Sequence, residues 1–308
     1  MEFNHISVLL EESVNALNIK PDGIYVDCTA GGGGHSAAVL ERLNENGKMY
    51  LFDRDPDAIE TVTKRFENDK RVTVIHSNFS EIKSVLTGLG VNGVDGIIAD
   101  LGVSSHQLDT AERGFSFHQD APLDMRMSKV GRSAEYIVNN YSQKELFDII
   151  NKYGEEKFAG SVATAIVRAR EESPIKTTLR LAEIVSDAIP AKFRRNGHPA
   201  RKTFQAIRIE VNAELTVLEN TLPDMFEMLN DGGVLAIITF HSLEDRIVKD
   251  YFKTLKEGCT CPKDFPVCVC GKKPKAIVKS AGITAQKKEL NENNRSRSAK
   301  LRTAVKLG

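Results

Sequence analysis

The sequence lacks a long apolar stretch, a net charge of either sign and an internal repeat. No segment approaches the roughly 18 consecutive apolar residues of a membrane-spanning helix, so we expect no membrane span. The first residues, Met1–His5, contain no basic run ahead of an apolar one. We therefore expect no signal peptide and a cytoplasmic protein.

Positive charge is concentrated in two tracts, although the 42 Lys and Arg residues balance the 42 Asp and Glu residues. The first tract, Lys192–Arg208, contains no acid, and the second, Lys272–Lys306, contains only Glu289 and Glu292. Such tracts on a neutral chain indicate an anionic partner bound at one place, and a solvated surface is the other interpretation. With 308 residues, 41% of them hydrophobic, the chain can bury a substantial core and form more than one domain.

A glycine-rich stretch, Asp27–Ser36, is the feature around which the chain is organised. It follows the apolar run Gly23–Val26, which predicts a strand, and precedes Ala37–Leu43, which has helical spacing. Consecutive glycines adopt backbone conformations closed to other residues and expose amides with no side chain in the way. This arrangement favours a nucleotide-like ligand at the first strand of a doubly wound sheet, and a tight turn without a ligand is the alternative. The candidate ligand contacts in the turn are Gly31, Gly33 and Gly34.

Three further strands follow, at Lys48–Phe52, Arg71–His76 and Val94–Asp100, each after a segment long enough for a helix. This alternation predicts a parallel, doubly wound sheet that binds ligands at the carboxyl ends of its strands. Asp53 follows the second strand, at a position where an acid typically binds ribose hydroxyls. A helix cap is the other interpretation of Asp53, but Asp55 is the better N-cap for the next helix, so ribose binding is favoured.

Beyond the fourth strand the alternation of strands and helices stops, and the chain is predicted to be helical from residue 113 to residue 199. Ser142 and Glu145 form a capping box, and Phe158–Arg170 and Thr178–Ile189 have helical spacing. A helix is expected from Phe204 to about Glu219. The sheet then resumes with strands at Val234–Phe240 and Ala299–Val305. The predicted fold is therefore α/β, with a discontinuous sheet domain of residues 1–112 and 200–308 and a helical insertion of residues 113–199 that shapes the substrate site.

Seven motifs are distributed from one end of the chain to the other. They are His5–Leu10, Asp27–Ser36, Asp100–Asp109, Pro122–Met127, Lys152–Glu156, Phe240–Arg246 and Asn293–Arg302. Together they resemble one family, the S-adenosylmethionine-dependent methyltransferases of the MraW type, which methylate cytosine N4 in small-subunit ribosomal RNA. The chain departs from the family pattern at Ser128, Lys202 and Asn294, where Asp, Arg and Pro are usual.

The resemblance implies a class I methyltransferase core interrupted by a helical domain, with S-adenosylmethionine as cofactor. It implies methylation of the N4 amine of a decoding-centre cytidine of 16S rRNA, position 1402 in standard numbering, with the small ribosomal subunit as partner. Of the cofactor contacts that it implies, His35 and Gln107 rest on the resemblance alone. The implied contacts are Gly33, Gly34, His35, Asp53, Phe79, Asp100 and Gln107.

The chemistry requires a positioned acceptor, because the lone pair of a cytosine amine is conjugated into the ring and is a poor nucleophile. Asp100, or a carbonyl just after it, is the candidate acceptor, and contact with the cofactor alone is the alternative. Ser104 is either a substrate contact or a loop cap. His241, which follows a strand, is either a general base or a structural histidine. Asn212, four residues after Arg208 on one helix face, is a candidate to hold the base or its phosphate.

The basic tracts supply the predicted RNA contacts, which bind backbone phosphates while the target base leaves its stack. Both monomer and homodimer are compatible with the sequence. The candidate RNA-binding residues are Arg194, Arg195, Arg201, Lys202, Arg208, Arg295 and Arg297.

Four of the five cysteines fall in one loop, as the pairs Cys259/Cys261 and Cys268/Cys270, while Cys28 is expected to pack in the core. In a cytosolic protein such thiols indicate a metal before a disulfide, so a structural zinc is one interpretation and free thiols are the other. The pairs are spaced Cys-x-Cys, whereas Cys-x-x-Cys is usual for zinc.

Two other functions remain open from the residues. A dinucleotide-dependent oxidoreductase would share the glycine turn and Asp53, but it leaves Asp100–Asp109, the basic tracts and the helical insertion unexplained. A non-catalytic ribosome assembly factor on a methyltransferase fold would share all of them.

Overall fold

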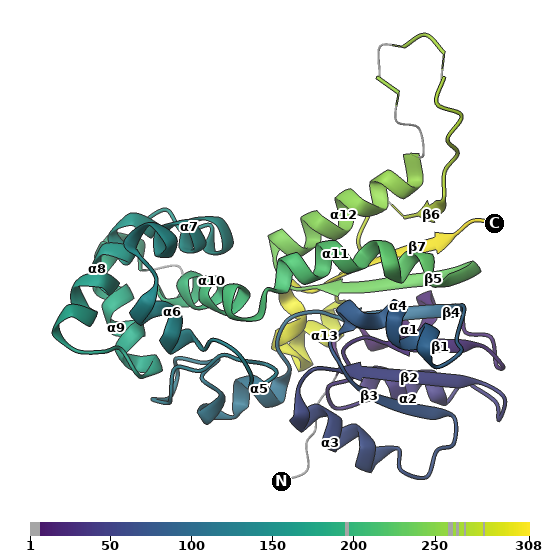
Figure 1. The fold of residues 1–308 in the computed structure, drawn as a ribbon, viewed down its shortest axis with the longest axis horizontal. Helices are drawn as coiled ribbons and strands as arrows, with labels where there is room; N and C mark the ends of the chain where they lie inside the picture. Colours follow the sequence, from purple (N-terminus) through teal and green to yellow (C-terminus); the bar gives the residue numbers. More distant parts are fainter. Residues whose placement is uncertain (1–6, 195–196, 258–260, 263–264, 268, 280) are drawn as a thin grey trace. The chain divides into compact units, whose positions relative to one another are not determined.

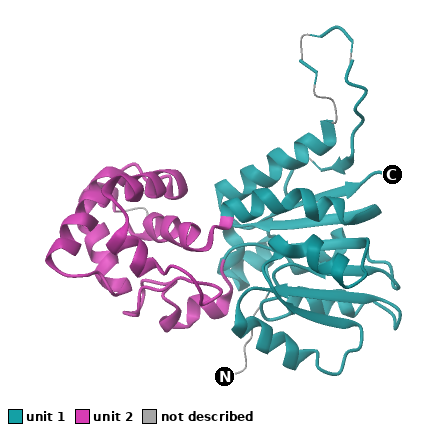
Figure 2. Cartoon of the chain, in the orientation of Figure 1, with its two compact units in different colours: residues 1–102, 215–308 teal, residues 103–214 magenta. Residues whose placement is uncertain are grey.

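The computed structural model describes residues 7–194, 197–257, 261–262, 265–267, 269–279 and 281–308 (Figure 1). Clustering of contacts divides the chain into two compact units (Figure 2). Unit 1 comprises Met1–Gly102 and Leu215–Gly308, and unit 2 is Val103–Glu214. Within the part of the chain that the structure describes, no helix is both long and apolar enough to cross a bilayer.

Unit 1 is built on a seven-stranded sheet with the order β3-β2-β1-β4-β5-β7-β6. Strands β1 to β5 run parallel, and β7 runs antiparallel to β5 and β6. This order with a reversed β7 is that of the class I methyltransferase sheet, so the predicted fold class is confirmed. The strands are β1 Ile24–Asp27, β2 Lys48–Asp53, β3 Val72–His76, β4 Val94–Asp100, β5 Leu229–Thr239, β6 Ala276–Val278 and β7 Lys300–Lys306.

Helices cover both faces of this sheet, as the alternation of buried side chains along β4 requires. Ile97 packs into one apolar cluster with residues of α4, α11 and α12, and Ile98 packs into the other with residues of α1, α2 and α3. Local signals set the helix starts: the Asp55 side chain accepts a hydrogen bond from the Asp57 N–H at 3.0 Å, ahead of α3. The helices are α1 Leu10–Ala16, α2 Gly34–Leu40, α3 Pro56–Arg65, α4 Ile82–Gly88, α11 Glu214–Glu227, α12 Ser242–Glu257 and α13 Lys287–Glu292.

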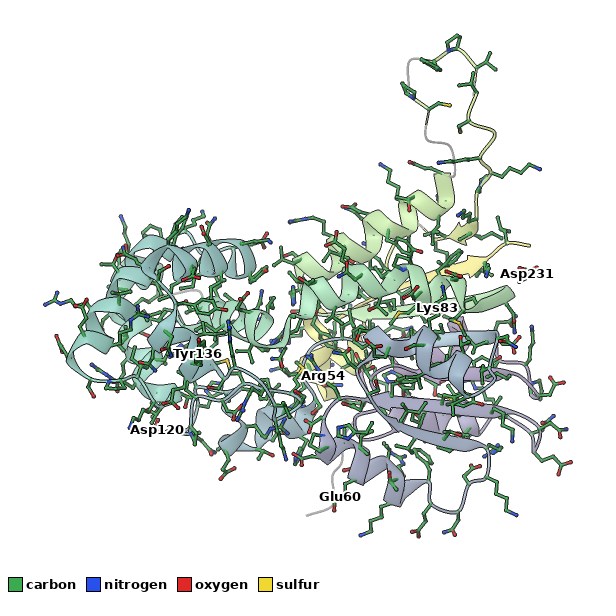
Figure 3. The ribbon with its side chains drawn as sticks, viewed as in Figure 1. Arg54, Glu60, Lys83, Asp120, Tyr136 and Asp231 are labelled. Carbon is green, nitrogen blue, oxygen red and sulfur yellow. The ribbon has the colours of Figure 1, made fainter. Side chains whose placement is uncertain are left out.

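Charged side chains of these helices lie on the surface of unit 1 (Figure 3). Glu60 of α3 is exposed. Lys83 of α4 forms an ion pair with Glu227 of α11, with 2.9 Å between Nζ and a carboxylate oxygen. Because these groups stay hydrated, they contribute little to stability, and the buried clusters hold the unit together.

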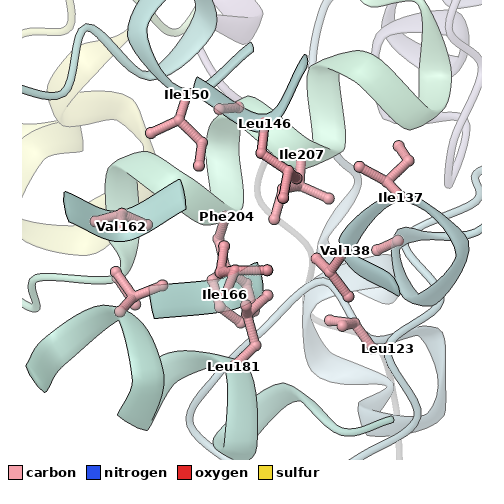
Figure 4. Packing of buried hydrophobic residues seen from close by; sticks show 14 of the residues in the cluster. Leu123, Ile137, Val138, Leu146, Ile150, Val162, Ile166, Leu181, Phe204 and Ile207 are labelled. Atoms are coloured by element: carbon pink, nitrogen blue, oxygen red, sulfur yellow. The ribbon is translucent and has the colours of Figure 1, made fainter. Parts of the chain in front are cut away.

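Unit 2 is helical and has its own apolar core (Figure 4). Leu146, Ile166, Leu181 and Ile207 are fully buried in it. The predicted capping box is present: Ser142 Oγ accepts from the Glu145 N–H and begins α7. The helices are α5 Ser105–Asp109, α6 Ala134–Asn140, α7 Gln143–Gly154, α8 Ala159–Glu172, α9 Thr178–Ala188 and α10 Arg201–Asn212.

The helical unit is wider than the insertion expected at residues 113–199, and the helix expected from Phe204 to Glu219 is two helices. Phe204 and Ile207 of α10 belong to the core of unit 2, so α10 belongs there too. Ala213 has a left-handed backbone, with φ of 50°, which ends α10 before α11 begins. At the other boundary, α5 already belongs to unit 2.

Candidate functional site

Three neighbouring strands of unit 1, β2, β1 and β4, each end on an aspartate: Asp53, Asp27 and Asp100. The strands are parallel, so these carboxyl ends meet at one edge of the sheet. Asp27 is not among the residues that the sequence analysis chose, although its place at the end of β1 is the same signal that identified Asp53. The edge therefore carries a cluster of three acids.

Asp53 shapes the glycine turn. One carboxylate oxygen accepts from the Gly31 N–H at 2.9 Å, and the other accepts from the Asp55 N–H at 2.8 Å. Arg65 adds a hydrogen bond to the Gly32 carbonyl at 2.6 Å. Gly33, with φ of 75°, precedes α2 in a left-handed conformation that favours glycine. The turn is thus held by side chains on two sides.

The segment before α1 packs against the other side of the turn. A Cβ atom at Gly34 would overlap the Ser7 hydroxyl, so a larger residue here would force the Ser7 side chain to move. His35 Nε2 lies 3.0 Å from the Val8 carbonyl, and because a carbonyl only accepts, Nε2 carries the proton. The segment Ser7–Val8 and the glycine turn therefore pack directly against each other.

Asp27 is buried, and its carboxylate accepts from Ser36 Oγ at 2.6 Å and from the Thr29 N–H at 3.0 Å. Burial raises its pKa, which His35 and these two hydrogen bonds counteract. Burial likewise raises the pKa of Asp53 to about 6. The charged forms of both acids are therefore disfavoured unless a positive group or further donors approach them.

Asp100 is the least satisfied of the three acids. Its N–H donates to Thr29 Oγ1 at 2.6 Å, and its Oδ2 lies 3.9 Å from His35 Nδ1. Its Oδ1 is buried and has no hydrogen-bond partner among the described residues. Burial, and then the charges of Asp27 and Glu244, raise the pKa of Asp100 well above its ordinary value. An acceptor left in this state is costly, so the site fits a ligand that brings a donor or a positive charge.

Phe79, the aromatic candidate, is half-buried and follows β3, where Asn78 caps a short 3-10 helix. Gln107 lies in unit 2, where its Oε1 accepts from the Ser104 N–H at 3.0 Å. Ser104 Oγ accepts in return from the Gln107 N–H at 3.2 Å. This capping box begins α5, so the structure gives Ser104 its predicted alternative role as a loop cap.

His241 lies two residues after Thr239, the last residue of β5, and directly ahead of α12. Its side chain is 10% exposed, and Nε2 lies 3.2 Å from a Glu244 carboxylate oxygen. Both ring nitrogens are buried and make no hydrogen bond within the described residues. His241 also lines a cavity of about 440 Å³ in unit 1.

Asn212 and Arg208 make hydrogen bonds inside unit 2. The Asn212 amide accepts from the Met127 N–H at 2.9 Å and donates to the Met125 carbonyl at 2.7 Å. Arg208 donates twice to the Glu214 carboxylate, at 2.8 and 2.9 Å. These bonds stabilise the unit, and contact of either side chain with the base or its phosphate stays a prediction.

The other basic candidates are distributed over both units. In unit 2, Arg201 is exposed, Lys202 Nζ donates to the Glu155 carbonyl at 2.8 Å, and Arg194 Nε donates to the Ile189 carbonyl at 2.8 Å. In unit 1, Arg297 is exposed and Arg295 is half-buried. Arg195 lies outside the described residues. Contact of these residues with RNA stays a prediction.

Two of the four loop cysteines, Cys259 and Cys268, lie outside the described residues. Cys261 and Cys270 are half-buried thiols, and Cys261 Sγ accepts from the Val269 N–H at 3.4 Å. The zinc site stays a prediction. Cys28 is buried in the core of unit 1, where burial raises the pKa of its thiol well above the ordinary value.

Relatives of this chain are found both by sequence and by structure. A protein of Clostridium botulinum strain 657, named ribosomal RNA small subunit methyltransferase H, is 55% identical over 309 residues, covering 100% of both chains. The protein of the same name from strain Kyoto matches equally. The crystal structure of an rRNA methylase from Streptococcus thermophilus, 11% identical, covers 97% of this chain and 94% of its own with a TM-score of 0.43. The model of the MraW methylase family matches residues 2–307, and the chain belongs to this family.

Proposed function

We propose that the chain is an S-adenosylmethionine-dependent methyltransferase of 16S rRNA, acting on the N4 amine of the decoding-centre cytidine. The name of the relatives at 55% identity supports the rRNA substrate class. The single observation that carries the chemistry is the buried, unpartnered Oδ1 of Asp100 at the end of β4. A cytoplasmic location and the small ribosomal subunit as partner follow from this substrate.

The acid cluster favours a cationic cofactor over a dinucleotide. S-adenosylmethionine carries a sulfonium, an ammonium and ribose hydroxyls, and when bound it supplies an electrophilic methyl group. Asp53 would accept from the ribose hydroxyls, the glycine turn would leave room for the nucleoside, and Phe79 would contact the adenine. The pyrophosphate of a dinucleotide would instead add negative charge beside Asp27, Asp53 and Asp100, which the electrostatics disfavour. This argues against the oxidoreductase alternative.

Asp100 would act on the target base as a hydrogen-bond and proton acceptor. A carboxylate aimed at the amine keeps the nitrogen lone pair directed at the methyl group and stabilises the positive charge that develops there. An amine that gains a methyl group has to lose one of its protons, and the Asp100 carboxylate would take up that proton. The positive charge of the bound cofactor would favour the ionised form of Asp100, and that buried carboxylate would then accept a proton more readily than an ordinary aspartate.

The decisive experiment measures methyl transfer to small subunits from cells that lack this protein, with mass mapping of the rRNA. Wild-type protein is expected to add one methyl group to the target cytidine. Asp100→Asn is expected to lower kcat by about 100-fold or more, because a preorganised acceptor is lost in the transition state. Transfer to another nucleotide, or to none, would contradict the proposal and favour an assembly factor.

Cofactor titration separates the two roles considered for Asp100. If the carboxylate acts on the amine, Asp100→Asn keeps affinity for S-adenosylmethionine while turnover falls. If it holds only the cofactor, affinity falls and kcat at saturating cofactor recovers. Wild-type protein should bind S-adenosylmethionine and not NAD.

A further inference from the structure

The cavity of about 440 Å³ beside His241 has no part in the chemistry described above. It lies where β5 ends and α12 begins, and the start of β7 closes it on another side. Neither the glycine turn nor Asp100 lines it. Its size is in the range of small-ligand sites, larger than a single water site. The polar lining residues that matter here are Ser242, Arg246, Lys249, Ser298 and Lys300.

The lining is positively charged. Arg246 and Lys249 are exposed and stand three residues apart on α12, so they share one face of the helix. The acid in the lining, Asp245, is already engaged: it accepts from Arg302 at 2.6 Å and from Lys300 at 3.1 Å. These bonds lower the pKa of Asp245, so it stays ionised and paired. The lining therefore carries the cations Arg246, Lys249 and Lys300 against the single carboxylate of Asp245, which already pairs with Lys300 and Arg302.

The rest of the wall suits a sugar-phosphate. Ser242 and Ser298 are exposed hydroxyls that can both donate and accept. The positive end of α12, a helix of 16 residues, opens at the same place. His241 belongs to the wall through its ring, since its nitrogens are buried.

We propose that this cavity binds the ribose and phosphodiester of an RNA nucleotide that flanks the target base, with Lys249 and Arg246 on the phosphate and the two serines on the ribose. The proposal rests on the proposed function and adds a subsite to it. It assigns the substrate contact to the end of β5, apart from the acid cluster that holds cofactor and amine. The cavity would thus fix the RNA strand while its neighbour is turned toward Asp100.

The test is the salt dependence of RNA binding, measured by fluorescence anisotropy with a single-stranded rRNA fragment in chloride salts. Each phosphate contact on single-stranded RNA contributes about 0.7 to the slope of log Kd against log salt. Lys249→Ala is expected to lower the slope by about this amount and to weaken binding several-fold. Lys253→Ala is the matched control on α12, because its amine pairs with Glu257 at 3.8 Å and does not line the cavity.

A second variant tests the cavity itself. Ser298→Asp replaces a proposed ribose contact by a carboxylate that would repel the adjacent phosphate, and it is expected to raise the Kd for RNA about tenfold or more, with S-adenosylhomocysteine affinity unchanged. Inorganic phosphate at millimolar concentration is expected not to displace RNA from wild-type protein, because the site needs the ribose as well. Displacement by free phosphate would overturn that part of the assignment.

The outcomes separate this proposal from the function on which it rests. If wild-type protein methylates the rRNA while Lys249→Ala and Ser298→Asp bind it with unchanged slope and affinity, the subsite is wrong and the function stands. If Lys249→Ala and Lys253→Ala lose the same slope, α12 is a general basic face and the cavity is not a subsite. If binding depends on Lys249 but no methyl is transferred, the subsite stands and the proposed function falls.

Discussion

The two units treat their polar residues in opposite ways. In unit 1, Asp100 Oδ1 is buried and has no hydrogen-bond partner in the part of the chain that the structure describes, and the pKa values of Asp27, Asp53 and Asp100 are all raised. In unit 2, the amide of Asn212 and the guanidinium of Arg208 are consumed by internal hydrogen bonds. All of these residue types are common in active sites. The state of bonding, more than the residue type, is therefore what distinguishes the candidate ligand site in unit 1 from the internal contacts of unit 2.

The largest expected effect is on the free energy of unfolding. Removal of a polar group is expected to destabilise unit 2 at Asn212 and to leave unit 1 equally stable or more stable at Asp100. Asn212→Ala removes the hydrogen bonds of the Asn212 amide to the Met127 N–H and the Met125 carbonyl, and loss of a buried hydrogen-bond partner costs about 1–3 kcal/mol. Asp100→Asn removes a carboxylate whose charged form is disfavoured in the folded state, so the apoprotein is expected to be as stable as wild type or more stable at neutral pH. Urea unfolding of the two variants without cofactor measures both effects.

The variant Asn140→Ala is the matched control for Asn212→Ala, because it also removes an asparagine amide from a helix of unit 2. Asn140→Ala changes an exposed asparagine of α6 whose amide donates only to the Tyr136 carbonyl, and it should cost far less than Asn212→Ala. Equal losses for the two asparagines, or a destabilised Asp100→Asn, would remove the contrast between the units.

The fold was predictable where one strand or helix carries its own signal. The five parallel strands, the Asp55 cap of α3 and the Ser142 capping box are all present near the predicted residues. Strand β6 has three residues, too few for an alternating pattern. The break at Ala213 could not be predicted, because alanine favours helix and no local pattern marks its left-handed conformation.

The residues of the candidate site also differ in whether a local sequence signal predicts their position. The positions of Asp53 and Asp100 at strand ends were predictable, because the strands that precede them are visible in the sequence. The structural role of Asn212 depends on Met127, 85 residues away, and no local pattern reports such a partner. Ser104 and Gln107 show the intermediate case, since their spacing fits a capping box as well as a ligand contact. Sequence therefore located the site edge but not the bonding state of its members.

The next effect compares two glycines of the turn in unit 1. Gly34→Ala brings a methyl group into the Ser7 hydroxyl, and overpacking of this kind costs about 1–3 kcal/mol. At Gly32 an added Cβ meets nothing within 4 Å, so Gly32→Ala should leave the stability of the apoprotein near wild type. Thermal unfolding without cofactor measures both. Similar melting temperatures for the two variants would mean that the contact between Ser7 and the turn does not constrain the fold.

The smallest effect concerns pH and belongs to unit 1 alone. The pKa of Asp53 is raised from 3.8 to about 6 by burial, so between these values the folded state holds a proton that the unfolded chain has lost. The stability of the apoprotein should therefore fall as pH rises from about 4 to 6, and Asp53→Asn should remove part of that fall. Urea unfolding at several pH values measures it, with Glu60→Gln on the exposed face of α3 as control. S-adenosylmethionine should also reduce the fall, because its ribose hydroxyls would hydrogen-bond the ionised carboxylate. If Asp53→Asn and wild type show the same pH dependence, the burial of Asp53 does not contribute to the free energy of unfolding. The contrast with unit 2 would then depend on Asp100 alone.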